Sequence, residues 1–545
     1  MDEKSKTKSK EANKTLEGRK DRIKRKFSKW FSDPYNKGFF WILILAAVLR
    51  IIVFQITKNQ GLWWDEAGYL AYAKQVAFGW DWTIMWNPHK PVLFSWLMAP
   101  IYKFGIGEIG VRIFILLMSI AAVWLVYLTA KEFFDKKIAL FSSFLMSVFW
   151  VHLFFTGRLL VELPSTTLFL ASLYFFARGY IKKENPKFIW WFGISFALAF
   201  LMRVSYGILI IPFILYFFME EKMKVFKNKN LWITLLLIVL IISPMIIWLF
   251  ANYQENPIGT FLGIGKNVAP ELGRLTTGMH VKGIWPSFAD LLYVLQPILL
   301  IIFIIGALLY FADILLGFDL IFKKDNPEIR KRLFILILIL IQLIAFGWFR
   351  AYIEQRDKMP IIIFLFAIAG FGLFKIRDYI AKEKQNILKF LNIIILLLVL
   401  FIGYGQMHFV LNSGESGTMS VKTSASSSYN LLKEIGLWMN GYSAKGAVII
   451  SAALPEMQYY TEREVHPFDA WDYGVPKTEN ESKADMQSIK TEFIEVHDPN
   501  SIPEIAPGWA FSYIPENNET FIPVMAWFSD AAKTKAVAVI YQVQH

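Results

Sequence analysis

The chain has 545 residues, of which 55% are hydrophobic and 19% are charged, whereas ordinary globular proteins carry about 25% charged residues. Apolar runs of near-membrane length recur between residues 39 and 406, so the composition excludes a disordered chain and a string of soluble domains. The chain has no cysteine, which excludes disulfides, cysteine-ligated zinc, iron–sulfur clusters and a thiol nucleophile. These features predict a polytopic membrane protein.

The formal net charge of +13 is distributed unevenly along the chain. Residues 1–38 hold thirteen Lys and Arg against six Asp and Glu, whereas residues 407–545 hold nine against seventeen. Basic segments beside membrane spans usually remain in the cytoplasm. We therefore expect a cytoplasmic N-terminal tail that is attracted to anionic membrane lipids, and no nucleic-acid partner.

A helix of about 20 apolar residues crosses the hydrocarbon core of a bilayer. Segments that approach this length predict an all-α membrane bundle of eleven spans: 39–56, 110–130, 138–156, 162–178, 188–203, 205–220, 231–252, 289–317, 333–350, 360–376 and 387–406. The apolar segment Pro91–Phe104 has only 14 residues, so we expect an interfacial or partly re-entrant helix on the outer side. With eleven spans, the strongly basic loops all fall on the cytoplasmic side.

This topology predicts a multi-pass protein of the cell membrane with three extracytoplasmic segments. The membrane domain, 39–406, contributes the outer loops 57–109 and 253–288, and the third outer segment is 407–545. Loop 253–288 contains six glycines among several cations. We expect this loop to be a mobile lid that orders over a bound ligand, although a plain connector is the alternative.

The third segment has the patterns of a small folded domain. Tyr429–Asn440 has a helical pattern, whereas Ala447–Ser451 and Ala536–Val543 have the composition of strands. We therefore expect a C-terminal extracytoplasmic α/β domain.

Charged residues recur where the predicted spans reach the outer surface. Asp65 and Glu66 lie in the sequence WWDEAGY, where they would either cap a helix or act as a general base or acid at the membrane surface. His89 and Lys90 lie in the sequence NPHKP. Lys90 would either reach a lipid headgroup or bind a phosphate.

Further charges follow at the outer ends of later spans. Arg158 and Glu162 are four residues apart and would form an ion pair or share one helix face. Arg203 ends the fifth span, and Arg356 and Lys358 precede the tenth. Lys and Arg are usually enriched on the cytoplasmic side of membrane proteins, so cations on the outer side are unusual. They suit a phosphate-bearing lipid, and the carboxylates beside them suit a base or a metal.

These segments resemble the polytopic GT-C class of glycosyltransferases, in particular the protein O-mannosyltransferases and the bacterial lipid A aminoarabinose transferases. The resemblance covers residues 39–406 and rests on short motifs in a fixed order: Asp65-Glu66, His89-Lys90-Pro91, Arg158 with Glu162 and Pro164, Arg203 before Gly207, and Arg356 before Pro360. Relatives often have Lys-Pro-Pro at Lys90-Pro91-Val92, Asp at Glu162, Lys at Arg203 and Arg-Tyr at Arg356-Asp357. These departures affect the expected donor and acceptor.

The resemblance implies transfer of a mannose-like hexose, or another hexose or pentose, from a polyprenyl- or dolichyl-phosphate donor. The acceptor would be a protein, a lipid or a glycan on the outer face, and the anomeric configuration would invert. Asp65 would be the general base, and Glu66 would substitute for it or position the acceptor. The donor phosphate would meet the cations Lys90, Arg158, Arg203, Arg356 and Lys358, with His89 and Glu162 as further site residues.

The sequence indicates no definite cofactor. A divalent cation, if one is bound, would have His89, Glu162 and His280 as candidate ligands, but the histidines lack the spacing that is typical of metal sites. A lipid or glycan transporter or flippase is the alternative function, and its charges would be expected near the bilayer midplane. A structural protein anchored by many spans would need no convergent cations.

Overall fold

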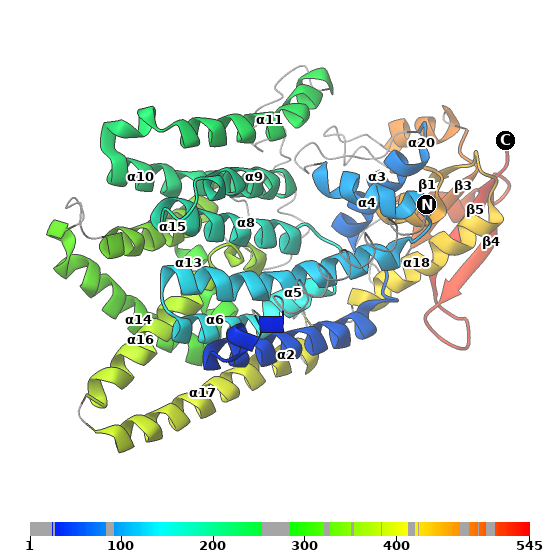
Figure 1. The fold of residues 1–545 in the computed structure, drawn as a ribbon. Coiled ribbons are helices and arrows are strands. Elements are labelled where there is room, and N and C mark those ends of the chain that lie inside the picture. Colours follow the sequence, from blue (N-terminus) through cyan, green and yellow to red (C-terminus); the bar gives the residue numbers. More distant parts are fainter. Residues whose placement is uncertain are drawn as a thin grey trace, which may run out of the picture.

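Helices fill most of the molecule, and a small sheet lies at one end of them (Figure 1). The computed structural model describes residues 24–25, 28–82, 92–252, 284–320, 327–349, 354–382, 384–412, 420–422, 425–468, 479–488, 490–497 and 507–545. Most of the basic tail, the predicted site residues His89, Lys90 and His280, and most of loop 253–288 lie outside the described residues.

Each of the eleven predicted spans is helical. The helices are α2 (Pro34–Thr57), α5 (Glu108–Phe133), α6 (Lys136–Val148) with α7 (Trp150–Thr156), α8 (Glu162–Phe176), α9 (Lys187–Met202), α10 (Ile210–Glu221), α11 (Lys229–Asn252), α13 (Ile284–Leu295) with α14 (Pro297–Leu316), α15 (Pro327–Phe349), α16 (Ile362–Ile380) and α17 (Gln385–Asn412). Short helical turns join several of them: η1 (Ala177–Ile181), η2 (Val204–Leu209), η3 (Lys222–Lys227), η4 (Phe318–Leu320) and η5 (Gln355–Lys358).

Length and composition support a membrane location for this bundle. Within the described ranges, six helices are long and apolar enough to cross a membrane, or seven if the bent pair α6 and α7 forms one span. The predicted polytopic helical bundle is confirmed, whereas the count of eleven spans is not. Two further apolar helices among the described residues, α9 and α13, are shorter and contribute to the core of the bundle.

The third predicted span is broken at Phe149, whose backbone is extended (φ −62°, ψ 121°), and α7 is bent by 50° from α6. Such a break leaves carbonyl and N–H groups without partners inside the helix. The buried guanidinium of Arg50, on α2, donates to the carbonyls of Met146 and Ser147. The Gln406 side chain, on α17, accepts the N–H of the first residue of α7. Two neighbouring helices therefore satisfy both sides of the break.

Two shorter helices cover the end of the bundle near the sheet, α3 (Trp64–Phe78) and α4 (Leu93–Lys103) (Figure 1). They pack on each other through the rings of Tyr69 and Phe94, and Ser95 donates a hydrogen bond to the Tyr69 carbonyl over 2.8 Å. The predicted short helix at Pro91–Phe104 is thus present as α4. Its position at a membrane interface remains a prediction.

The C-terminal domain is an α/β unit, as predicted. Its helices are α18 (Ala425–Tyr442), α19 (Leu454–Thr461), α20 (Glu479–Ser488) and α21 (Ala510–Glu516), and its strands are β1 (Val448–Ile450), β2 (Glu464–His466), β3 (Phe493–His497), β4 (Phe521–Phe528) and β5 (Ala536–Val543). The strand order is β2-β1-β3-β5-β4. The first three strands are parallel, and β5 runs antiparallel to both β3 and β4.

Candidate functional site

A buried cluster of charged side chains forms where the ends of three helices meet. Glu162 begins α8, Arg203 follows the last residue of α9, and Arg356 and Asp357 lie in η5, just before α16. Oε1 of Glu162 accepts hydrogen bonds from Nη1 of Arg203 over 2.6 Å and from Nη1 of Arg356 over 2.9 Å. Nη2 of Arg203 donates to Oδ1 of Asp357 over 2.9 Å. Four residues from distant parts of the sequence therefore share one charge network.

Asp65 lies at the edge of this network, in the first turn of α3. Its Oδ2 is 3.9 Å from Nη1 of Arg356, and 40% of its side chain is exposed. Burial lowers the pKa of Arg356, but the carboxylates of Glu162, Glu354 and Asp65 raise that pKa well above its ordinary range, so the guanidinium stays charged. Asp65 is therefore an accessible carboxylate beside a fixed positive charge.

Glu66 has a different environment, although it is the next residue. Its side chain is buried, and its two oxygens accept the backbone N–H groups of Trp63 and Leu159, each over 2.8 Å. Burial raises the pKa of Glu66, while Arg158 and these N–H groups oppose that rise. Nη1 of Arg158 is 3.7 Å from Glu66, and its guanidinium lies 4.1 Å from the Trp63 ring centroid. Glu66 thus ties the start of α3 to the connection between α7 and α8.

The other predicted phosphate-binding cations differ in accessibility. Lys358 is almost fully buried and forms an ion pair with Asp290 of α13. The side chains of Arg158 and Lys358 are each 2% exposed, compared with 10% for Arg203 and 15% for Arg356. Among the predicted cations that the structure describes, Arg356 is therefore the most accessible.

Sequence reasoning missed two carboxylates that complete these pairs. Asp357 stands between two residues that were selected, and its charge was a sufficient signal. Asp290 is a lone carboxylate at the start of the predicted span 289–317. A charge at the end of an apolar span is itself a signal for a functional residue, as it was for Asp65 and Glu162. Neither can be assigned to its partner from the sequence, because Asp290 and Lys358 are 68 residues apart.

The predicted divalent-cation site is only partly described. Glu162 is buried, and its Oε2 has no hydrogen-bond partner among the described residues. Within that part of the chain, no group of three or more His, Asp and Glu side chains has the geometry of a metal site. The remaining candidate ligands, His89 and His280, lie outside the described residues.

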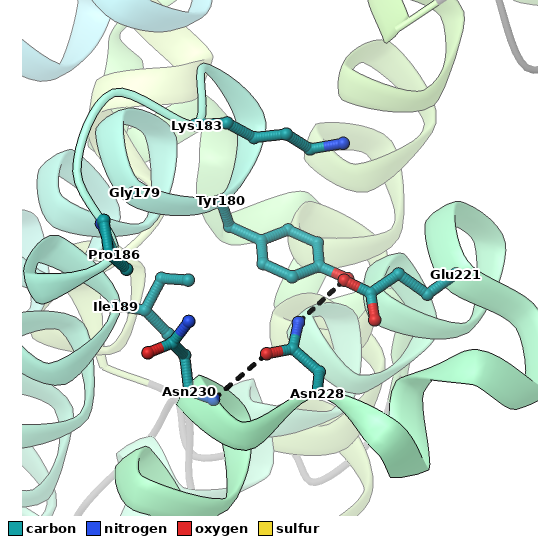
Figure 2. Close-up of a pocket in the computed structure, with 8 residues that line it drawn as sticks. All are labelled: Gly179, Tyr180, Lys183, Pro186, Ile189, Glu221, Asn228 and Asn230. Atoms are coloured by element: carbon teal, nitrogen blue, oxygen red, sulfur yellow. Dashed lines mark hydrogen bonds between the residues drawn. The ribbon is translucent and has the colours of Figure 1, made fainter.

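Figure 2 shows a separate pocket of about 190 Å³. It is lined by Gly179, Tyr180, Lys183, Pro186, Ile189, Glu221, Asn228 and Asn230. Glu162 begins α8 and η1 follows its other end, so the rise of a helix separates the two places by about 22 Å. In the pocket, Asn228 donates to Glu221 and accepts the N–H of Asn230. The pocket is therefore separate from the Asp65 cluster and contributes no residue to it.

Comparison with known proteins identifies the architecture. Residues 89–248 match the family described as dolichyl-phosphate-mannose-protein mannosyltransferase. The chain resembles the solved structure of ArnT from Cupriavidus metallidurans bound to undecaprenyl phosphate, with a TM-score of 0.61 and 12% identity over 92% of this chain and 98% of that one. The chain has the GT-C fold. The resemblance expected from the sequence motifs is thereby confirmed.

Two further solved structures share the GT-C fold. One is the archaeal oligosaccharyltransferase AglB from Archaeoglobus fulgidus in complex with an inhibitory peptide and a dolichol-phosphate, with a TM-score of 0.59 and 12% identity over 86% of this chain and 70% of that one. The other is the arabinofuranosyltransferase AftD from Mycobacteria, with a TM-score of 0.53 and 12% identity over 93% of this chain and 40% of that one.

A relative by sequence is an uncharacterized protein of Aquifex aeolicus (strain VF5). It is 25% identical over 187 residues, which are 33% of this chain and 37% of that protein. The chain thus matches little more than a third of the length of this curated relative. This relative adds no information about the donor or the acceptor.

Proposed function

We propose that this protein is a membrane glycosyltransferase that moves a sugar from a polyprenyl-phosphate donor to a hydroxyl acceptor on the extracytoplasmic face, with inversion. One observation carries the proposal. An exposed carboxylate, Asp65, lies 3.9 Å from the charged Arg356 at the end of a bundle with the GT-C fold. A base beside a cation is the combination that sugar transfer from a phosphate needs.

The chemical step would be a direct displacement. The acceptor oxygen forms a bond to the anomeric carbon while the bond from that carbon to the phosphate oxygen breaks, and the bonding electrons leave with the phosphate. Asp65 takes the proton of the acceptor hydroxyl. Attack from the face opposite the leaving phosphate inverts the anomeric centre.

The leaving phosphate gains negative charge, and fixed cations would stabilise it. Arg356 is the first candidate because it is the most accessible described cation of the cluster. Arg203 lies behind it, on the same oxygen of Glu162, and would hold Arg356 and Glu162 in place. Lys90 remains a proposed phosphate ligand on the sequence evidence. Lys358 could reach a phosphate only by sharing or leaving its Asp290 partner.

Asp65, and not Glu66, is proposed as the base. Both oxygens of Glu66 accept backbone hydrogen bonds, and the side chain is buried. A proton taken by Glu66 would disrupt the hydrogen bonds that fix the start of α3. Glu66 therefore supports the site by holding the helix that carries Asp65.

The test compares Asp65→Asn with Glu66→Gln in sugar transfer from a polyprenyl-phosphate donor in liposomes. Asp65→Asn should reduce kcat about 100- to 10,000-fold, because a placed general base contributes that much, and should still bind the donor. Glu66→Gln should retain measurable turnover but unfold at a lower temperature, because its amide nitrogen would face a backbone N–H group. Near-normal turnover by Asp65→Asn would refute the assignment, and an inactive but stable Glu66→Gln would transfer the role to Glu66.

A further inference from the structure

Backbone N–H groups of the segment that leads into α3 form hydrogen bonds with side chains of the C-terminal domain. The N–H of Gly61 donates to Oδ1 of Asn430 on α18 over 2.6 Å, and the N–H of Leu62 donates to the Tyr460 hydroxyl on α19 over 2.9 Å. Leu62 and Tyr460 are both buried. These two hydrogen bonds fix consecutive peptide groups three and four residues before Asp65.

Gly61 makes this attachment possible. A Cβ at this position would lie 2.1 Å from the carbonyl oxygen of Tyr429, which no side chain tolerates without a shift of the backbone. The neighbouring Trp63 ring stacks on the Tyr429 ring, with centroids 5.7 Å apart and planes 21° apart. The guanidinium of Arg158 lies against the same indole. The start of α3 therefore lies between the C-terminal domain and the connection that carries Arg158.

The far part of α3 is attached to the same domain. Nζ of Lys74 donates to the Tyr459 carbonyl over 2.9 Å, pairs with Glu462 at 2.7 Å and lies 4.0 Å from the Tyr459 ring centroid. The hydroxyl of Tyr459 also contacts that of Tyr102 on α4, at 3.0 Å. The C-terminal domain thus holds α3 both before its first turn and near its end.

We propose that the C-terminal domain acts as a clamp that positions Asp65 for sugar transfer, with Asn430 and Tyr460 as its positioning residues. This inference rests on the proposed function of the Asp65 cluster. A base must be held in place to about the accuracy of a hydrogen bond, and a displacement of 1 Å can cost about 100-fold in rate. Glu66 fixes α3 to the connection between α7 and α8, and the clamp fixes it to the C-terminal domain.

Two pairs of variants test the clamp in the full-length protein. Gly61→Ala should lower kcat about 100-fold by displacing the segment, whereas Gly441→Ala, at a position with open space around it, should leave kcat unchanged. Tyr460→Phe removes only the hydroxyl and should lower kcat about tenfold. Tyr442→Phe removes an exposed hydroxyl of α18 and is its control. Affinity for the donor should remain that of the wild type in all four.

A distance measurement supplies a readout that does not depend on activity. Val76→Cys on α3 and Leu437→Cys on α18 replace exposed residues in a chain without cysteine, so spin labels can be attached to them alone. Gly61→Ala should broaden or lengthen the distance between the labels, and Gly441→Ala should not.

Wild-type kcat in both Gly61→Ala and Tyr460→Phe would overturn the clamp and leave the proposed function standing. If the wild-type protein transfers no sugar from any polyprenyl-phosphate donor, the proposed function fails. In that case the distance measurement still tests the clamp: an unchanged label distance in Gly61→Ala would refute the attachment of α3 to the C-terminal domain.

Discussion

At the scale of single residues, one carboxylate oxygen organises the candidate site. Oε1 of Glu162 accepts hydrogen bonds from both Arg203 and Arg356, and Arg203 continues the network to Asp357. The sequence led us to expect Arg203 chiefly as a phosphate ligand. Its geometry gives it a second role, because it pairs with two buried carboxylates, Glu162 and Asp357, and its removal would take a counter-charge from each.

Arg203→Ala should therefore destabilise the protein as well as impair donor use. Loss of one partner from a buried ion pair costs about 3–5 kcal/mol, and unfolding in detergent without donor would measure it. Arg178→Ala is the matched control, because Arg178 and Glu184 form a partly exposed pair whose loss should cost less than about 1 kcal/mol. Equal effects of the two substitutions would contradict the importance of the network.

Arg356→Lys separates charge from geometry. Lysine keeps the positive charge but cannot hold Glu162 and a phosphate with the planar fork of arginine. A charge-assisted hydrogen bond contributes about 1.5–3 kcal/mol, so donor affinity should fall at least tenfold. Binding of a polyprenyl phosphate to the purified variant would measure this. Unchanged binding would assign the phosphate to other cations.

Much of the candidate site could be predicted from the sequence because charged residues are uncommon beside apolar membrane spans. Cations and carboxylates at the outer ends of apolar spans are costly, which drew attention to Asp65, Arg158, Glu162, Arg203 and Arg356. The sequence could not separate the roles of Asp65 and Glu66. Adjacent residues on a helix point in directions about 100° apart, and only the packing of α3 decides which one is buried.

At the scale of elements, one arginine satisfies the carbonyl side of the break between α6 and α7. Arg50 donates to two carbonyls at the break and lies 2.9 Å from Nδ1 of His152 on α7. Arg50→Met should cost about 3 kcal/mol or more, because it leaves several buried polar groups without partners. Ile51→Met, at an exposed neighbouring position, should cost little. Thermal unfolding of both variants in the same detergent would check this, and equal midpoints would contradict it.

The helices were predictable because each needs only a long apolar run. Of the two breaks within predicted spans, only one has a signal in the sequence. Pro297 gives a visible reason for the break between α13 and α14, where Gln296 has a φ of 63°. Phe149 gives no such signal, since the break there is stabilised by Arg50 and Gln406 from other helices. In the C-terminal domain, β1 and β5 were predicted from their apolar residues. The short β2, the fully buried β3 and the largely exposed β4 were missed.

At the scale of the whole molecule, orientation is the main prediction that remains to be tested. The basic loops predict that the N-terminus lies inside and the C-terminal domain outside. Because the chain has no cysteine, Trp30→Cys and Asn480→Cys can each be labelled alone. An impermeant thiol reagent added to intact cells should label the second and not the first until the cells are opened. Labelling of both from the same side would refute the topology.

The length of α17 also has a consequence for the whole molecule. Its 28 residues extend over about 42 Å, whereas a bilayer core is about 30 Å thick. Only 11% of its most apolar stretch is buried inside the protein, which is the exposure expected of a helix that faces lipid. The same helix carries Gln406, which holds the start of α7, and α7 leads to Arg158. We therefore expect the tilt of α17 to depend on bilayer thickness and to move Gln406 and the start of α7 with it, so that the geometry near Arg158 responds to acyl-chain length.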